Sequence, residues 1–340
     1  MAIDSPKSPP KTSTASHATA ASTSSTRPIS ADSRFKPDFQ TWLKTHGYGD
    51  YDFAKNPNAL PSFGGKSSAN EKLTKQPVIL IHGNGDNAAG WNDVAAGYKR
   101  NGYKDSEIYA MSWGDGKAKS AGNNYHSEHY LREVRGFIEA VKEYTGADKV
   151  DVIGHSMGVT LARKAIKGGT GVDQAAPGGK YDLGKPINDE VDTFVGIAGA
   201  NEGLLSCDLL GNPNPTSSTV NGFSQHSQFL KELNADPTRE GDHVYSIYSL
   251  ADPILGYGPL GGVYTGPIPH QDGGEILYTL GHFQSRDQTV GAQLDMIQDH
   301  HATPAQFENP WLPSNWPTSM KSSMSWDLAA NPEGKPKAEK

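Results

Sequence analysis

The chain has 340 residues, of which 35% are apolar and 20% charged, enough for one large domain or two small ones with a buried core. The formal net charge is −7 and no long run of lysine or arginine occurs, so nucleic acid is not an expected partner. Val78–Ile81, the longest apolar run, has the length of a strand, so we expect no transmembrane segment.

The first 34 residues have the composition of a disordered leader. They contain 14 serines and threonines, four prolines and no aromatic residue, and so cannot bury enough apolar surface to offset the cost of ordering. The folded part is expected to begin near Phe35, where Phe39, Trp42, Leu43 and Tyr48 bring the first packing side chains.

From Pro77 onward, segments with the pattern of strands alternate with segments of helical periodicity. The clearest helix contains Leu131, Val134, Ile138, Val141 and Tyr144 at three- and four-residue spacing and is followed by Gly146. Two shorter helices are predicted near Asn92–Arg100 and Val159–Lys167, and another over Asp287–Gln298. The predicted strands are Val78–Ile81, Glu107–Ser112, Val150–Ile153, Thr193–Ile197, Val244–Tyr248 and Glu275–Leu280.

This alternation predicts an α/β fold with a mostly parallel central sheet and helices on both faces. We expect a single catalytic domain over residues 35–326, with a Pro- and Trp-rich segment at Asn309–Trp326 and a polar tail at residues 327–340. The Gly- and Pro-rich stretch Ala251–Gly274 is too long for a tight turn and suggests a functional loop.

A G-x-S-x-G pentapeptide at Gly154–Gly158 places Ser156 between a predicted strand and a predicted helix. This context is typical of a nucleophile elbow, in which a strained turn projects the serine hydroxyl above the edge of the sheet. An ordinary turn between strand and helix is the alternative. We predict that Ser156 is a nucleophile.

A serine hydroxyl needs a base to take its proton and a carboxylate to orient that base. Asp252 follows the strand Val244–Tyr248 and is the predicted acid, with Asp208 as the main rival and Asp272 as a weaker one. His282 directly follows the next predicted strand and is the predicted base. Of the other histidines after Asp252, His300 and His301 lie at a helix end, where a favourable interaction with the helix dipole explains them, and His270 follows no strand.

The oxyanion of an ester-hydrolysis intermediate needs two backbone N–H donors. Met157, directly after the nucleophile, is expected to supply one, and Asn84 in the loop His82–Asn87 the other. Such chemistry needs no cofactor. His126 and His129 could offer two metal ligands, but they lack an obvious third, and we assign no metal site.

These motifs resemble those of α/β-hydrolases, and Pro77–Trp91 with Val150–Val159 resembles the bacterial class 2 lipases. More closely, the chain is similar to the lipase-like poly(3-hydroxybutyrate) depolymerases over roughly residues 77–290. The segments that carry this similarity are His82–Asn87, Asn124–Ser127, Gly154–Val159, Ala198–Gly199 with Gly203–Leu204, and Gly281–Phe283.

The resemblance implies that Ser156, Asp252 and His282 form a catalytic triad, that Asn84 and Met157 form the oxyanion hole, and that an aliphatic polyester or related ester is the substrate. The segment around Tyr125 would lie near the cleft mouth. We treat Tyr125, His82 and His155 as candidate substrate-binding residues.

The resemblance also implies a secreted protein, although many relatives are disulfide-bonded whereas Cys207 is the only cysteine here. No apolar leader region occurs in Met1–Pro10, so a cytoplasmic location is the alternative. We expect a monomer.

The sequence therefore predicts a serine esterase that acts through an acyl-enzyme, most specifically a polyester depolymerase. A triacylglycerol lipase or small-ester carboxylesterase is the alternative within the same chemistry. The alternative of another class is a binding protein on a hydrolase scaffold. Trp311, Trp316 and Tyr257 could adsorb to an apolar polymer or merely cover the core.

Deletion of Met1–Arg34 is expected to leave the melting temperature unchanged, because its composition offers no buried contacts. Differential scanning calorimetry of the full and shortened chains measures this. A fall of several degrees would show that the segment packs on the folded part.

Overall fold

The computed structural model describes residues 34–54, 62–209, 214–255 and 265–302. The predicted leader up to Ser33, the Pro- and Trp-rich segment with Trp311 and Trp316, the polar tail and Tyr257 lie outside these ranges. None of the helices in the described ranges combines the length and the apolar composition of a membrane-spanning segment.

A parallel six-stranded sheet, ordered β2-β1-β3-β6-β7-β8, forms the centre of the fold, as the alternating sequence pattern predicts. Each of the six predicted strands is present, with ends that differ by up to three residues. The observed strands are β1 (Val78–Ile81), β2 (Ile108–Met111), β3 (Val150–His155), β6 (Val191–Ile197), β7 (His243–Ser249) and β8 (Gly273–Leu277).

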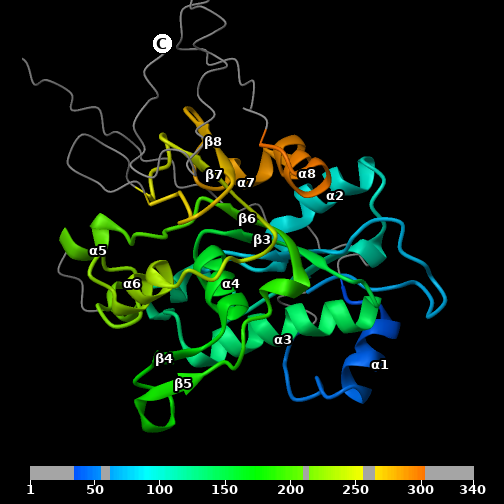
Figure 1. Ribbon diagram of the computed structural model, residues 1–340, viewed down its shortest axis with the longest axis horizontal. Helices are drawn as coiled ribbons and strands as arrows, with labels where there is room; N and C mark the ends of the chain where they lie inside the picture. The colour runs from blue at the N-terminus through cyan, green and yellow to red at the C-terminus, as the bar shows by residue number, and fades with distance from the viewer. Residues whose placement is uncertain (1–33, 55–61, 210–213, 256–264, 303–340) are drawn as a thin grey trace, which may run out of the picture.

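The helices cover the sheet on both faces (Figure 1), which confirms the predicted α/β fold class. Helices α3 and α4 pack together on one face, and α2 and α8 lie on the other. The helices are α1 (Pro37–Thr45), α2 (Asn92–Arg100), α3 (Glu128–Thr145), α4 (Met157–Lys167), α5 (Leu205–Leu209), α6 (Gln228–Ala235), α7 (Gln284–Asp287) and α8 (Val290–Asp299).

Three features differ from the sequence prediction. The helix predicted over Asp287–Gln298 is two helices, α7 and α8, because Gln288 and Thr289 leave the helical path between them. The pattern predicts neither α1, α5 and α6 nor the antiparallel hairpin of β4 (Thr170–Val172) and β5 (Lys180–Asp182). These elements are short, and the hairpin contains few of the β-branched residues that mark a strand.

The hydrophobic core includes the strands of the sheet and extends to the aromatic residues of α1. Phe35, Phe39 and Leu43 are buried, and Trp42 and Tyr48 pack against the same core. Phe39 contacts Phe137 of α3, so α1 is fixed to the long helix beneath the sheet.

The order of the strands determines where a site can form. From β1 the chain moves first to β2 on one side and then to β3 on the other, so the loops after β1 and β3 diverge at the carboxyl edge of the sheet. Crevices that bind ligands in open α/β sheets occur at such a switch point. Here the two loops are His82–Asn87 and the turn at Ser156.

Two glycines allow the turn at Ser156 to fit between β1, β3 and α4. A side chain at Gly158 would collide with the carbonyl oxygens of Ile81 and His82, and one at Gly154 would lie 2.7 Å from Val159 Cα. The G-x-S-x-G spacing is therefore a packing requirement as well as a chemical signature.

Substitution Gly158→Ala is expected to destabilise the fold by about 1–3 kcal/mol, because the new methyl group meets immobile backbone. Gly291→Ala in α8 is the matched control, since no atom lies within 4 Å of a methyl group there and alanine favours the helix. Urea unfolding measures both. Equal stability of the two variants would contradict the tight packing at Gly158.

Candidate active site

Ser156 lies on a strained turn between β3 and α4. Its φ of 54° and ψ of −124° fall outside the regions that residues with side chains ordinarily adopt. Such a conformation costs on the order of 1–3 kcal/mol and persists only where the surrounding structure holds it. Here the Ser156 N–H donates to Ile197 O at 2.9 Å, and the Val159 N–H donates to Ser156 O at 3.0 Å.

Asp252 and His282 meet at the same edge of the sheet, beyond β7 and β8. His282 Nδ1 lies 2.7 Å from Asp252 Oδ2, and both side chains are buried. The other carboxylate oxygen accepts hydrogen bonds from the N–H groups of Ile254 at 2.8 Å and Leu255 at 3.0 Å. These bonds hold the carboxylate in place. Because Nδ1 of His282 faces Asp252, Nε2 is the ring nitrogen that remains for proton transfer in the predicted role of His282.

A ring contact beside Ser156 brings His282 close to the strained turn. His155, the residue before Ser156, has its ring centroid 4.7 Å from that of His282. No hydrogen bond joins Ser156 to His282 among the described residues. Hydrogen bonds between a catalytic serine and its base are often long in a free enzyme and tighten when substrate binds.

The rival residues are occupied elsewhere. Asp208 accepts hydrogen bonds from Ser224 Oγ at 2.6 Å and the Gln225 N–H at 2.9 Å. Asp272 pairs with Arg239, which also donates to the carbonyl of His270. His300 and His301 lie at the end of α8, where the sequence places them.

His155 positions His282, the predicted base, through a hydrogen bond to the His282 backbone. His155 Nε2 donates to the carbonyl of His282 at 3.1 Å, which fixes the loop that carries the base. Burial lowers the pKa of His155 well below its usual value, and the neighbouring His282 and Arg286 lower it further. A neutral His155 adds no charge that would oppose protonation of His282.

His82 anchors the loop after β1. Its ring stacks on that of Trp113 with centroids 4.9 Å apart, and its Nε2 accepts the Trp113 N–H at 2.9 Å. Burial lowers the pKa of His82 to about 4. The rings of His82 and His155 are both buried, which favours packing and positioning roles over the direct substrate contact that we expected for them.

The loop after β1 brings Asn84 and Gly83 toward Ser156. A side chain at Gly83 would lie 2.8 Å from Ser156 Cβ, so only glycine permits this approach. The Asn84 side chain donates to Ala121 O at 2.9 Å and accepts from Asn124 at 2.7 Å. Met157 begins α4, and N–H groups in the first turn of a helix lack partners within it. The helix dipole also favours a negative charge at that end.

A partly buried ion pair joins the loop after β1 to the helix after His282, and sequence reasoning missed it. Arg286 NH1 lies 2.6 Å from Asp86 Oδ2, and its guanidinium lies over the rings of Trp91 and Phe283. Although burial opposes the charge, the carboxylates of Asp287 and Asp86 raise the pKa of Arg286 above its ordinary value. No local sequence pattern signals a pair 200 positions apart.

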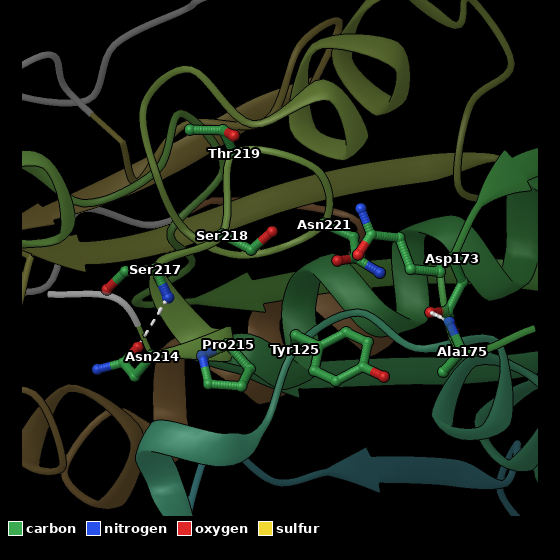
Figure 2. A pocket seen from close by; sticks show the side chains of 10 residues that line it. Tyr125, Asp173, Ala175, Asn214, Pro215, Ser217, Ser218, Thr219 and Asn221 are labelled. Carbon is green, nitrogen blue, oxygen red and sulfur yellow. Dashed lines mark hydrogen bonds between the residues drawn. The ribbon is translucent and has the colours of Figure 1, made fainter. Parts of the chain in front are cut away.

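Tyr125 lines a pocket of about 690 Å³ with a mixed polar and apolar lining. Figure 2 shows its ring between Pro215 and Ala175. Of the described residues that line this pocket, none belongs to the predicted triad. Thr216, between the lining residues Pro215 and Ser217, has its Oγ1 2.5 Å from Ala121 O and 2.6 Å from Asn124 O. Ala121 and Asn124 also bond to the Asn84 side chain, so the pocket is connected to the loop after β1.

The two histidines that the sequence offered as metal ligands do not converge. His126 is buried, with its nitrogens near Asn221 O at 2.9 Å and Thr160 Oγ1 at 2.7 Å. His129 is exposed and faces Glu133.

The sheet order, the serine turn after β3 and the side chains beyond β7 and β8 are those of an α/β-hydrolase. The sequence model of the class 2 lipases, described as "Lipase (class 2)", matches residues 75–295, more than half of the chain. The chain therefore belongs to the class 2 lipase family.

Solved structures similar to this one include three lipases. Aspergillus fumigatus lipase B has a TM-score of 0.48 and 15% identity, with 80% of this chain and 62% of that chain covered. Mature Bacillus licheniformis lipase BlEst2 has a TM-score of 0.47 and 15% identity, with 69% and 96% covered. Paleococcus ferrophilus monoacylglycerol lipase has a TM-score of 0.45 and 15% identity, with 71% of this chain and 98% of that chain covered.

Substitution Arg286→Lys is expected to lower kcat by about 10- to 100-fold, because a lysine cannot hold Asp86 and Asp287 together and the loop after β1 shifts relative to His282. Arg239→Lys is the matched control, since Arg239 also pairs with an aspartate but at the opposite edge of the sheet. Turnover of a p-nitrophenyl ester measures both. A similar kcat in the two variants would contradict the positioning role of Arg286.

Proposed function

We propose that this protein is a carboxylic ester hydrolase that acts through an acyl-enzyme on Ser156. The observation that carries the proposal is the 2.7 Å contact between His282 Nδ1 and Asp252 Oδ2, beside a serine held on a strained turn. Membership of the class 2 lipase family supports the same reaction class.

In the proposed mechanism, His282 Nε2 removes the proton from Ser156 Oγ as the oxygen attacks the ester carbonyl. Asp252 stabilises the resulting imidazolium and keeps the ring in the required tautomer. The N–H groups of Met157 and Asn84 stabilise the oxyanion. His282 then protonates the leaving alcohol, and a water molecule repeats the sequence to release the acid. No cofactor takes part in these steps.

We further propose that the natural substrate is an aliphatic polyester of the poly(3-hydroxybutyrate) type. Apolar side chains near the base remain open to solvent: Ile254, Tyr278 and Phe283 are 44%, 37% and 46% exposed. Ile254 lies two residues after Asp252, and Tyr278 and Phe283 directly follow β8 and His282. We propose that these three side chains form an apolar rim where an ester chain would approach.

Substitution Asp252→Asn is expected to lower kcat by about 10⁴-fold, because the amide favours the wrong tautomer of His282. Asp208→Asn is the control and is expected to change kcat by less than about tenfold, since Asp208 accepts its hydrogen bonds from Ser224 and Gln225 rather than from His282. Steady-state kinetics with p-nitrophenyl butyrate measure both. The reverse ranking would overturn the assignment of the acid.

Incubation with amorphous poly(3-hydroxybutyrate), a triglyceride and p-nitrophenyl butyrate in parallel tests the substrate class. We expect soluble 3-hydroxybutyrate oligomers to appear faster than fatty acid, and product analysis by chromatography measures both. Ser156→Ala is the blank, with turnover reduced on the order of 10⁴-fold. Faster triglyceride cleavage would favour a lipase and short-ester cleavage alone a carboxylesterase, whereas no turnover of any ester would favour a binding protein.

A further inference from the structure

Three side chains that can bind metal meet at the edge of the sheet opposite Ser156. Asp192 is the second residue of β6, His243 is the first residue of β7, and His300 follows the end of α8. The strands β6 and β7 are neighbours and pair in register from Thr193 with His243. Because Ser156 lies beyond the carboxyl end of β3, this cluster is separate from the candidate active site.

The geometry of the cluster is close to that of a three-ligand metal site. One ligand atom from each residue lies within 4.8 Å of the other two. His300 Nε2 is 3.0 Å from Asp192 Oδ2, and the rings of His243 and His300 stack with centroids 3.9 Å apart. Ligand atoms held about 2.0–2.2 Å from a tetrahedral zinc ion stand roughly 3.3–3.6 Å apart. To bind one ion, the three side chains would have to rotate so that the two stacked rings turn their nitrogens toward a common point.

The surroundings prepare the carboxylate to act as a ligand. Gln76 Nε2 donates to Asp192 Oδ2 at 3.2 Å and to Asp151 Oδ1 at 2.8 Å, which orients the group as outer-shell residues do in metal sites. The His300 side chain is 40% exposed, so an ion can enter from solvent.

The backbone at His300 is also unusual. This residue ends α8 with a φ of 51°, a left-handed conformation that costs free energy for a residue with a side chain. An interaction that holds the histidine against β6 and β7 offsets part of that cost.

We propose that Asp192, His243 and His300 bind one divalent transition-metal ion, with water completing the coordination. Two imidazole nitrogens and one carboxylate oxygen suit Zn²⁺ and similar ions, whereas Ca²⁺ and Mg²⁺ prefer an all-oxygen shell. The bound ion would join the end of α8 to the starts of β6 and β7. This role is structural and independent of the proposed ester hydrolysis.

Calorimetric titration of the untagged, chelator-treated full chain with Zn²⁺ tests the proposal. We compare the native protein with His243→Gln and with His300→Asn, in which asparagine tolerates the left-handed backbone. His301→Ala is the matched control, because His301 is the next residue, is exposed and lies outside the cluster. Circular dichroism verifies that each variant is folded.

We expect the native protein and His301→Ala to bind one Zn²⁺ with equal affinity. The melting temperature of both is expected to rise when Zn²⁺ is added. Either cluster variant is expected to bind more than about tenfold more weakly and to lose that gain. Absence of Zn²⁺ binding by the native protein, or equal binding by all four proteins, would overturn the proposal and leave an ordinary pair between His300 and Asp192. If one variant fails to fold, the other decides by the same criteria.

Discussion

The backbone conformation of Ser156 is the constraint from which the proposed site follows. A residue with a φ of 54° is held there by hydrogen bonds to Ile197 and Val159 and by the absence of side chains at Gly154 and Gly158. The free-energy cost of the turn is on the order of 1–3 kcal/mol, and the packing of α4 against β1 and β3 offsets it. This conformation projects the Ser156 hydroxyl above the carboxyl edge of the sheet.

The remaining parts of the site reach the same place because of the sheet topology. The loop after β1 approaches so closely that only glycine fits at position 83, and the loops after β7 and β8 bring Asp252 to His282. A hydrogen bond and an ion pair between loops then fix the relative positions of these loops. His155 bonds to the His282 carbonyl, and Arg286 bonds to Asp86 in the loop after β1. Each link joins residues far apart in sequence, so the site depends on the whole fold.

Local patterns in the sequence were sufficient to predict the six strands of the parallel sheet, the longer helices between them, and the meeting of Asp252 and His282 at neighbouring strand ends. Each of these depends on short-range signals, such as a run of β-branched residues or a motif at a strand end. The ion pair of Arg286 with Asp86, the packing of His82 on Trp113 and the cluster around Asp192 were not predictable in this way. Their members come together only when the strands are placed side by side.

The same distinction explains why the reaction class is better supported than the substrate. The reaction depends on groups at strand ends, which the fold fixes. The substrate depends on loops such as those around Tyr125 and Asn214, which line a pocket that contains no residue of the predicted triad. An apolar rim of Ile254, Tyr278 and Phe283 favours an apolar ester but is compatible with more than one acyl chain.

The most direct measurement of the central claim is covalent labelling with a fluorophosphonate ester, followed by peptide mass spectrometry. The account predicts one label per chain, attached to Ser156, with loss of esterase activity in proportion to labelling. Labelling is also expected to slow markedly in His282→Ala, since the base activates the serine. Full esterase activity without a label on Ser156, or a label on another residue that abolishes activity, would contradict the account.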